Sequence, residues 1–494
     1  MGSLTTEVHY PDASDQSLVL THPTAAEKQQ TWRLNHREWG GPLDLAAYLE
    51  REPFLASTPL GADGGMVHWI LTETTAPPRR VLASCETIRK RVLYVPRDSV
   101  DHVREGLGYG IGSVYTYPEF RGKQYAARML RELGGVLKTW PREEQQQQLK
   151  KKLSQIRGQG QGQGSNLLNG NEIGVGSGEP QQSNGQKTKL HEAAGEAVCS
   201  ALWSDIGKRF YASKGWPVFA SGHVEFPSSS PSSPPGVSSL LEQSKQPHGT
   251  SLTLAPVTTS NVAQLCREDE AQLRAELLRH ARATNRTAFA FAPDPDVFRW
   301  HWAREEFIVS HVFPGREASE VRGMIATVTS ASTTDTATTT DGTVGGVDND
   351  AKEGEKEEEE NKKTRMWAIW TRNYGADAAS NAAKNTLYIL RFVIDNNTDN
   401  DNDNDSTSSS DPKALQLAFD AILQGALDAA RTWHCGSVHL WNPTPAVRAL
   451  IAGSGVAHRF VDREVDSIPS MMWYGSDETE EAVDWIANEK YCWC

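Results

Sequence analysis

The chain has 494 residues, with 63 acidic side chains against 50 Lys and Arg, for a formal net charge of −13. At roughly 100–200 residues per domain, this length predicts two or three domains. Two stretches carry nearly all the excess charge: residues 335–364 hold ten acids and four lysines, and residues 395–411 hold six aspartates and no base. The rest of the chain is close to neutral, so it lacks the basic surface of a nucleic-acid-binding protein. No run of 18 apolar residues is present, so no membrane-spanning helix is expected.

The cysteines and the N-terminus indicate an intracellular, cytoplasmic protein. The six cysteines show no C-x-x-C spacing, so we expect reduced thiols and no metal site. The N-terminus has no basic stretch followed by an apolar one, which a secretory signal would require.

Four polar segments divide the chain. They contain too few apolar residues to be ordered by burial, and we interpret them as disordered. Three are predicted insertions, at about 143–196, 331–364 and 395–411, and the fourth is a Ser/Pro-rich linker at 227–250. The linker separates a predicted N-terminal domain, 1–226, from a predicted C-terminal domain, 251–494.

Predicted strands and helices alternate along the N-terminal half. Short apolar runs predict strands at 18–20, 67–71, 81–89, 112–117 and 218–226. Apolar periodicity and boundary residues predict helices at 25–37, 43–51, 123–138 and 203–213. This order indicates an α/β (mixed α+β) fold, in which helices flank a central mixed sheet.

The C-terminal half repeats this rhythm loosely. Strands are predicted at 321–328, 366–371, 386–394, 437–441, 458–465 and 470–474, and helices at 412–433 and 445–452. The similar order suggests a second copy of the same architecture.

The most informative stretch is 111–130, where a strand ends, the chain turns and a helix begins. Unpaired backbone N–H groups and the helix dipole favour an anion at such a turn. Arg121 and Lys123 add positive charge, so a phosphate or pyrophosphate is the expected occupant. The alternative is an ordinary tight turn with exposed bases.

Within this turn, the sequence Arg121-Gly122-Lys123-Gln124-Tyr125-Ala126 resembles the R-x-x-G-x-[GA] acetyl-coenzyme A signature of the GCN5-related N-acetyltransferase (GNAT) superfamily. Gln124 departs from the signature, which usually has glycine there so that the backbone can approach the pyrophosphate. The segment 203–216 resembles a later block of the same superfamily. More narrowly, segments 32–39, 83–87 and 205–211 resemble the fungal L-lysine N6-acetyltransferases of lysine catabolism.

The resemblance implies a set of site residues, with acetyl-coenzyme A as co-substrate. Tyr211 would protonate the leaving thiolate, while Glu38 and Trp39 would bind the substrate. The strand 108–117 holds no acid, so the candidate base is Glu86 on the neighbouring strand. The cofactor-binding residues would be Val114, Tyr115, Thr116, Arg121, Gly122, Lys123, Gln124, Tyr125 and Ala126.

Each of these roles has a simpler alternative. Glu86 would otherwise be an exposed strand carboxylate paired with Arg89 or Lys90. Tyr211 would be an ordinary core aromatic residue, and Glu38 a charge on a helix surface.

The C-terminal half lacks the phosphate turn, because an Asp/Asn tract stands where the N-terminal half has Arg121 to Ala126. We therefore expect a degenerate GNAT-like domain that supports the fold or borders the acceptor pocket. The expected activity is transfer of acetyl from acetyl-coenzyme A to the N6 amine of free L-lysine by direct attack. The alternatives are another small amine, a protein lysine, or a non-catalytic coenzyme A-binding sensor or scaffold.

Overall fold

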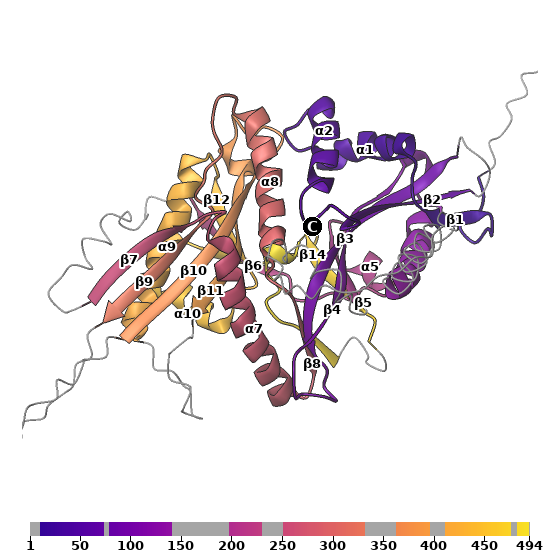
Figure 1. Ribbon diagram of the computed structural model, residues 1–494. Coiled ribbons are helices and arrows are strands. Elements are labelled where there is room, and N and C mark those ends of the chain that lie inside the picture. The colour runs from indigo at the N-terminus through magenta and orange to yellow at the C-terminus, as the bar shows by residue number, and fades with distance from the viewer. Residues whose placement is uncertain are drawn as a thin grey trace, which may run out of the picture.

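The computed structural model describes residues 10–73, 79–140, 197–229, 250–330, 362–395, 411–475 and 482–493 (Figure 1). Most of each predicted disordered segment lies outside these ranges. The predicted boundary at 364 is wrong by a few residues, because residues 362–364 already belong to a strand.

Eight of the described strands form the first sheet. Its main order is β1-β2-β3-β4-β5-β14, and β8 pairs with the far end of β3 while β15 pairs with β8. The strands are β1 (Leu18–Thr21), β2 (Met66–Glu73), β3 (Val81–Val95), β4 (Arg104–Thr116), β5 (Ala197–Ser204), β8 (Thr287–Phe291), β14 (Ile468–Trp473) and β15 (Val483–Trp485).

The N-terminal half also contains helices, most of which connect strands of this sheet. They are α1 (Ala25–Trp39), α2 (Leu45–Ala56), a helix over 125–140 and the short α5 (Arg209–Ala212). Thr24 caps α1 through a capping box with Glu27, and Asp44 caps α2. These caps fix where both helices begin.

The second sheet contains seven of the described strands, in the order β13-β6-β12-β11-β10-β9-β7. They are β6 (Gly222–Pro227), β7 (Thr250–Val257), β9 (Gly323–Ser330), β10 (Lys362–Asn373), β11 (Thr386–Asp395), β12 (Ser437–Trp441) and β13 (Arg459–Asp462).

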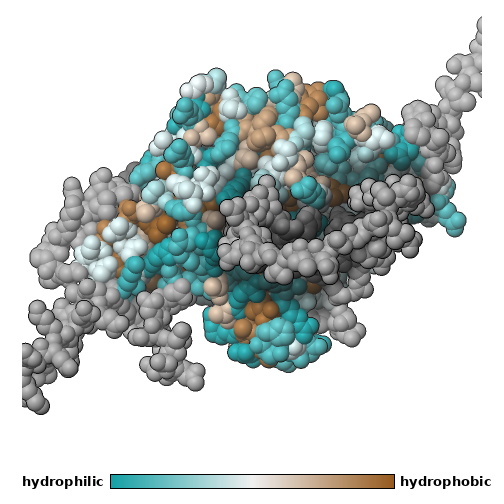
Figure 2. All heavy atoms as spheres, viewed as in Figure 1, coloured by the Kyte–Doolittle hydropathy of each residue, from teal (hydrophilic) through white to brown (hydrophobic). Residues whose placement is uncertain are grey.

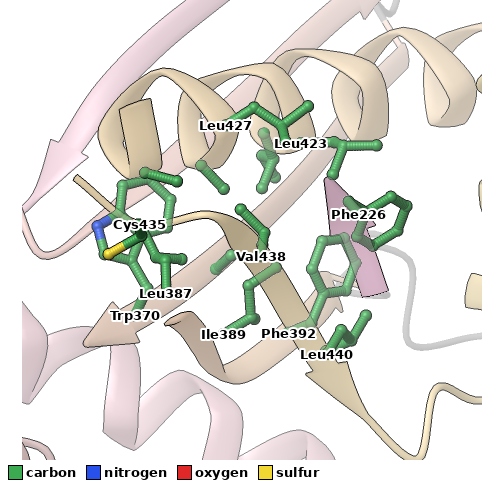
Figure 3. Close-up of a cluster of buried hydrophobic side chains, with 14 of the residues drawn as sticks. Phe226, Trp370, Leu387, Ile389, Phe392, Leu423, Leu427, Cys435, Val438 and Leu440 are labelled. Carbon is green, nitrogen blue, oxygen red and sulfur yellow. The ribbon is translucent and has the colours of Figure 1, made fainter. Parts of the chain in front are cut away.

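Helices cover both faces of the second sheet. On one face α9 (Pro412–Thr432) and α10 (Pro445–Gly453) enclose a core in which Leu423 and Leu427 point toward Val438 and Leu440 (Figure 3). On the other face α7 (Val262–Thr284) and α8 (Pro295–Val312) lie between the two sheets (Figure 1). The result is a mixed α/β structure with helices flanking mixed sheets, which confirms the predicted fold class.

Strands cross between the two halves of the chain. The N-terminal β6 pairs with β12 and β13 in the second sheet, while the C-terminal β14 pairs with β5 in the first. The C-terminal β8 also joins β3. The division into domains 1–226 and 251–494 stays a prediction, and the strand pairing runs across it in both directions.

Several predicted boundaries in the N-terminal half are wrong. The strand predicted at 112–117 begins at Arg104, and the strand predicted at 218–226 begins at Gly222. The helix predicted at 203–213 is confined to α5, because residues 197–204 form β5, whose side chains are all buried. A strand buried on both faces has no alternating pattern that would reveal it in the sequence.

The surface is mainly hydrophilic in the view of Figure 2, where apolar residues form small separate patches. Within the described ranges, no helix is both long and apolar enough to cross a membrane.

Candidate active site

The edge of β4 becomes free where β4 and β5 separate. Their parallel pairing runs from Leu107–Ala197 to Ile111–Leu202 and ends there, whereas β4 continues to Thr116 on β3 alone. A register irregularity accompanies the separation, and Ser113 adopts a positive φ of 51°. The predicted cofactor strand, Val114 to Thr116, therefore lies on this free edge, where its backbone has no partner in β5.

The predicted phosphate turn follows directly. Residues 121–124 are exposed and the helix begins at Tyr125. The first N–H groups of a helix have no partner within it, so they are available to an anion at this point. Arg121 lies 3.8 Å from Glu38 (Nη2 to Oε1), and its Nε donates to the Thr116 carbonyl at 3.2 Å. This arrangement fits a phosphate-bearing ligand that lies along the free edge of β4.

Gln124, the residue that departs from the family signature, has the left-handed backbone conformation that glycine favours. Its φ is 66°, and that of Gly122 is 78°. A non-glycine residue in this region costs about 1–2 kcal/mol, which glycine avoids. The fold thus retains the shape of the glycine turn although the glycine is missing.

We therefore expect Gln124→Gly to tighten acetyl-coenzyme A binding by about three- to tenfold, since without the side chain the pyrophosphate can approach the backbone more closely. Isothermal titration calorimetry would measure the affinity. Asn285→Gly is the matched control, because Asn285 ends α7 with a φ of 54° and lies outside the turn. Binding equal to or weaker than that of the unchanged protein would contradict the expectation.

A cavity of about 450 Å³ lies between the two halves. This volume is within the range of about 300–1,000 Å³ that is usual for small-molecule sites. The cavity brings together five of the predicted residues, while Arg121 to Ala126 are not part of its wall. The five residues are Glu38, Trp39, Glu86, Val114 and Tyr211.

Glu86 is buried in the wall of the cavity. Its Oε1 lies 2.8 Å from His68 Nε2, Trp32 Nε1 donates to it at 3.3 Å, and Ser113 Oγ donates to Oε2 at 3.3 Å. Burial alone would raise the pKa of Glu86, but the imidazole and these hydrogen bonds together hold that pKa below its ordinary value. The side chain is therefore an ionised carboxylate. The alternative of an exposed carboxylate paired with Arg89 or Lys90 is wrong.

Tyr211 has its ring in the core of the first sheet and also lines the cavity. Its hydroxyl forms no hydrogen bond with any described residue. Burial raises the pKa of Tyr211 well above its ordinary value, so the phenol stays protonated. A protonated hydroxyl at the cavity is able to donate a proton to a leaving group.

Glu38 and Trp39 lie at the C-terminal end of α1. Glu38 is half-exposed and Trp39 packs edge-on against Tyr115, with ring centroids 6.0 Å apart. Both side chains border the cavity close to the free strand edge.

Charge is distributed unevenly around the cavity. The N-terminal half contributes the acids Glu38, Glu52, Glu86 and Asp205, together with Arg51, whereas the C-terminal half contributes the bases Arg304, Arg372 and Lys490. Burial raises the pKa of Glu52 although Arg51 pairs with it at 2.5 Å. The sequence reasoning missed Glu52 and Arg304. They lie on helices far apart in the chain, and no motif links them.

A second polar cluster lies on the second sheet, where His223, Glu225 and His439 approach one another. His223 Nε2 is 3.0 Å from Glu225 Oε1, and the other oxygen of Glu225 accepts from Arg459 Nη2 at 2.5 Å. Ser437 Oγ lies 3.0 Å from His439 Nε2. The oxygens of Glu225 and both Nε2 atoms thus already have partners within the protein.

Comparison with known proteins places the chain in a family. Residues 238–494 match the family model described as the LYC1 GNAT-like C-terminal domain. The uncharacterized protein YGR111W of Saccharomyces cerevisiae is 25% identical over 142 residues, which are 24% of this chain and 36% of that protein. The chain therefore spans about a third of the length of this curated relative.

Three solved structures are similar at low identity. A probable N-acyltransferase from Enterococcus faecalis V583 has a TM-score of 0.41 and 11% identity, over 92% of this chain and 72% of that one. A GCN5-related N-acetyltransferase from Kribbella flavida has a TM-score of 0.40 and 12% identity, over 92% and 70%. A tandem GNAT protein from the clavulanic acid biosynthesis pathway has a TM-score of 0.36 and 9% identity, over 93% and 99%.

The family match also agrees with the prediction of a GNAT-like second domain. Because it covers more than half of the residues, the chain belongs to the LYC1 GNAT-like family.

Proposed function

We propose that the protein transfers the acetyl group of acetyl-coenzyme A to the N6 amine of free L-lysine by direct attack. The observation that carries this proposal is the cavity beside the free edge of β4, which holds an ionised Glu86 and a protonated Tyr211.

In this proposal, the free edge of β4 and the turn at 121–126 bind acetyl-coenzyme A. Backbone groups of Val114 to Thr116 would hydrogen-bond the pantetheine arm, and one N–H would polarise the thioester carbonyl. Arg121, Lys123 and the N–H groups at the start of the following helix would hold the pyrophosphate.

In the transfer itself, Glu86 would act as the general base and Tyr211 as the general acid. The lysine ammonium, with a pKa near 10.4, must lose a proton before it can attack. Glu86 would accept this proton directly or through water, and the amine nitrogen would bond to the carbonyl carbon as the C–S bond breaks. Tyr211 would give its proton to the departing thiolate, and the second proton that the nitrogen loses as the amide forms would restore the phenol.

The acceptor is argued from the walls of the cavity. Both halves of the chain enclose it, which suits a small molecule better than the lysine of a protein, for which an open groove is needed. Acids on one wall and bases on the other match a molecule that carries ammonium groups and a carboxylate. A diamino acid such as lysine has both, and a role in cytoplasmic lysine catabolism is part of the same proposal.

The test is a thiol-release assay with acetyl-coenzyme A and a panel of free amino acids and polyamines. We expect lysine to be turned over preferentially, with acetylation at N6 verified by mass spectrometry. Turnover of many amines at similar rates would contradict lysine selectivity. Binding of acetyl-coenzyme A without thiol release for any amine would favour the sensor.

A further inference from the structure

We propose that Arg304 binds the α-carboxylate of the acceptor, so that the C-terminal half selects free amino acids over amines that lack a carboxylate. This inference rests on the proposed function, since it concerns the same cavity and the same acceptor.

Arg304 comes from α8, which runs between the two sheets (Figure 1). Its half-buried side chain lines the cavity. Nη1 donates to the side-chain oxygen of Asn373 at 2.9 Å, and the guanidinium carbon lies 5.7 Å from the ring centre of Trp493. Among the described residues, no carboxylate forms an ion pair with Arg304. The guanidinium therefore retains donors without a charged acceptor.

Three buried arginines of the C-terminal half, Arg322, Arg372 and Arg391, are neutralised by acids. Glu305 pairs with Arg322 at 2.7 Å and also with Arg372. Arg391 pairs with Asp269 at 2.6 Å and with Glu489. These three arginines thus have acidic partners, whereas Arg304 has none among the described residues.

Arg463 also lacks a carboxylate partner, but its position differs. It stacks on Trp441, with the guanidinium carbon 3.9 Å from the ring centre, and it does not border the cavity. A structural role explains Arg463, whereas Arg304 faces the space that a ligand would occupy.

The electrostatic surroundings indicate what Arg304 lacks. Burial, with the nearby positive charge of Arg51, lowers the pKa of Arg304 to about 10, and the charge of Glu52 offsets this only in part. A carboxylate beside the guanidinium would compensate its buried positive charge through two parallel charge-assisted hydrogen bonds. The ligand class is therefore an organic anion small enough to enter the cavity.

The acids that the N-terminal half contributes to the cavity specify the rest of the ligand. Glu86 comes from the N-terminal half and favours an ammonium group, whereas Glu52 already pairs with Arg51. An acceptor with its carboxylate at Arg304 and an amine toward Glu86 is an amino acid with a second, terminal amine. A diamine without a carboxylate would leave the guanidinium unpaired.

The experiment compares L-lysine with 1,5-diaminopentane, which is lysine without its carboxylate. For the unchanged full-length protein we expect kcat/KM to be at least about 100-fold higher for lysine. Arg304→Gln should lower kcat/KM for lysine by about 100-fold, mainly through KM, and change that for the diamine by less than about threefold. The diamine rate also reports that the variant is folded.

Arg299→Gln is the matched control, since Arg299 lies on the same helix, is partly exposed and pairs with Asp296. It should leave both substrates unaffected. Equal losses for lysine and the diamine in Arg304→Gln would overturn the carboxylate site while leaving lysine acetylation intact. Equal kcat/KM values for lysine and the diamine in the unchanged protein would also overturn the carboxylate site. An unchanged protein that acetylates neither would instead contradict the proposed function, and the acceptor site with it.

Discussion

Replacing Glu86 by glutamine is expected to lower the turnover number by about 100-fold or more. Glutamine preserves the shape of the side chain and its contacts with Trp32 and Ser113, but it cannot accept a proton. Turnover would be measured as free thiol released at saturating acetyl-coenzyme A and lysine. The KM for acetyl-coenzyme A should change little, because the carboxylate acts on the acceptor amine.

Tyr211→Phe completes this test, since it removes the proton donor proposed for the thiolate. It should reduce turnover while leaving acetyl-coenzyme A binding intact. Glu119→Gln is the control, because Glu119 is an exposed carboxylate close to the phosphate turn. If both Glu86→Gln and Tyr211→Phe turned over lysine at the original rate, the assignment of the catalytic residues would be wrong.

The largest effect on stability is expected at Glu305, in the middle of α8. This buried carboxylate accepts from Arg322 Nη1 at 2.7 Å, from Thr371 Oγ1 at 2.9 Å and from the backbone N–H of Arg372 at 2.7 Å. Glu305→Gln would leave Arg372 buried without its counter-charge and Arg322 with only the partly exposed Glu306. Removing one partner of such a network costs about 3–5 kcal/mol, so the midpoint of urea unfolding should fall markedly.

Glu306→Gln tests whether the loss of stability depends on the burial of the carboxylate and not only on the loss of its charge. Glu306 also pairs with Arg322, but its side chain is 44% exposed. An exposed pair contributes at most about 1 kcal/mol, so this variant should unfold close to the original midpoint. Equal shifts for the two variants would show that the buried network is not what holds α8 to the second sheet.

The sequence predicted the elements with strong local signals. The helix after the phosphate turn, the strand β2 and the amphipathic α9 all lie close to their expected positions. The separation of β4 from β5 occurs where the motif places the cofactor strand. In each case the pattern belongs to a few neighbouring residues and does not depend on distant contacts.

Several of the features that escaped prediction depend on distant contacts, although the helices α7 and α8, which are local features, were also missed. Strand β5 is apolar on both faces, and β8 joins the first sheet from the other half of the chain. The contact of Glu86 with His68 joins neighbouring strands, and nothing in the sequence indicates that Arg304 lines the same cavity as Glu86. Pairing between sequence-distant residues is what a single sequence does not reveal.

The exchange of β6 and β14 has a consequence for folding and catalysis. Each sheet needs a strand from the other half of the chain, so a fragment ending near residue 226 would lack the neighbours of β6 and expose an edge of β5. The two sheets are therefore expected to unfold as one cooperative unit. Because each half supplies a strand to the sheet of the other, the acids of the N-terminal half are held in place relative to Arg304. The acceptor site is therefore preorganised before a substrate arrives.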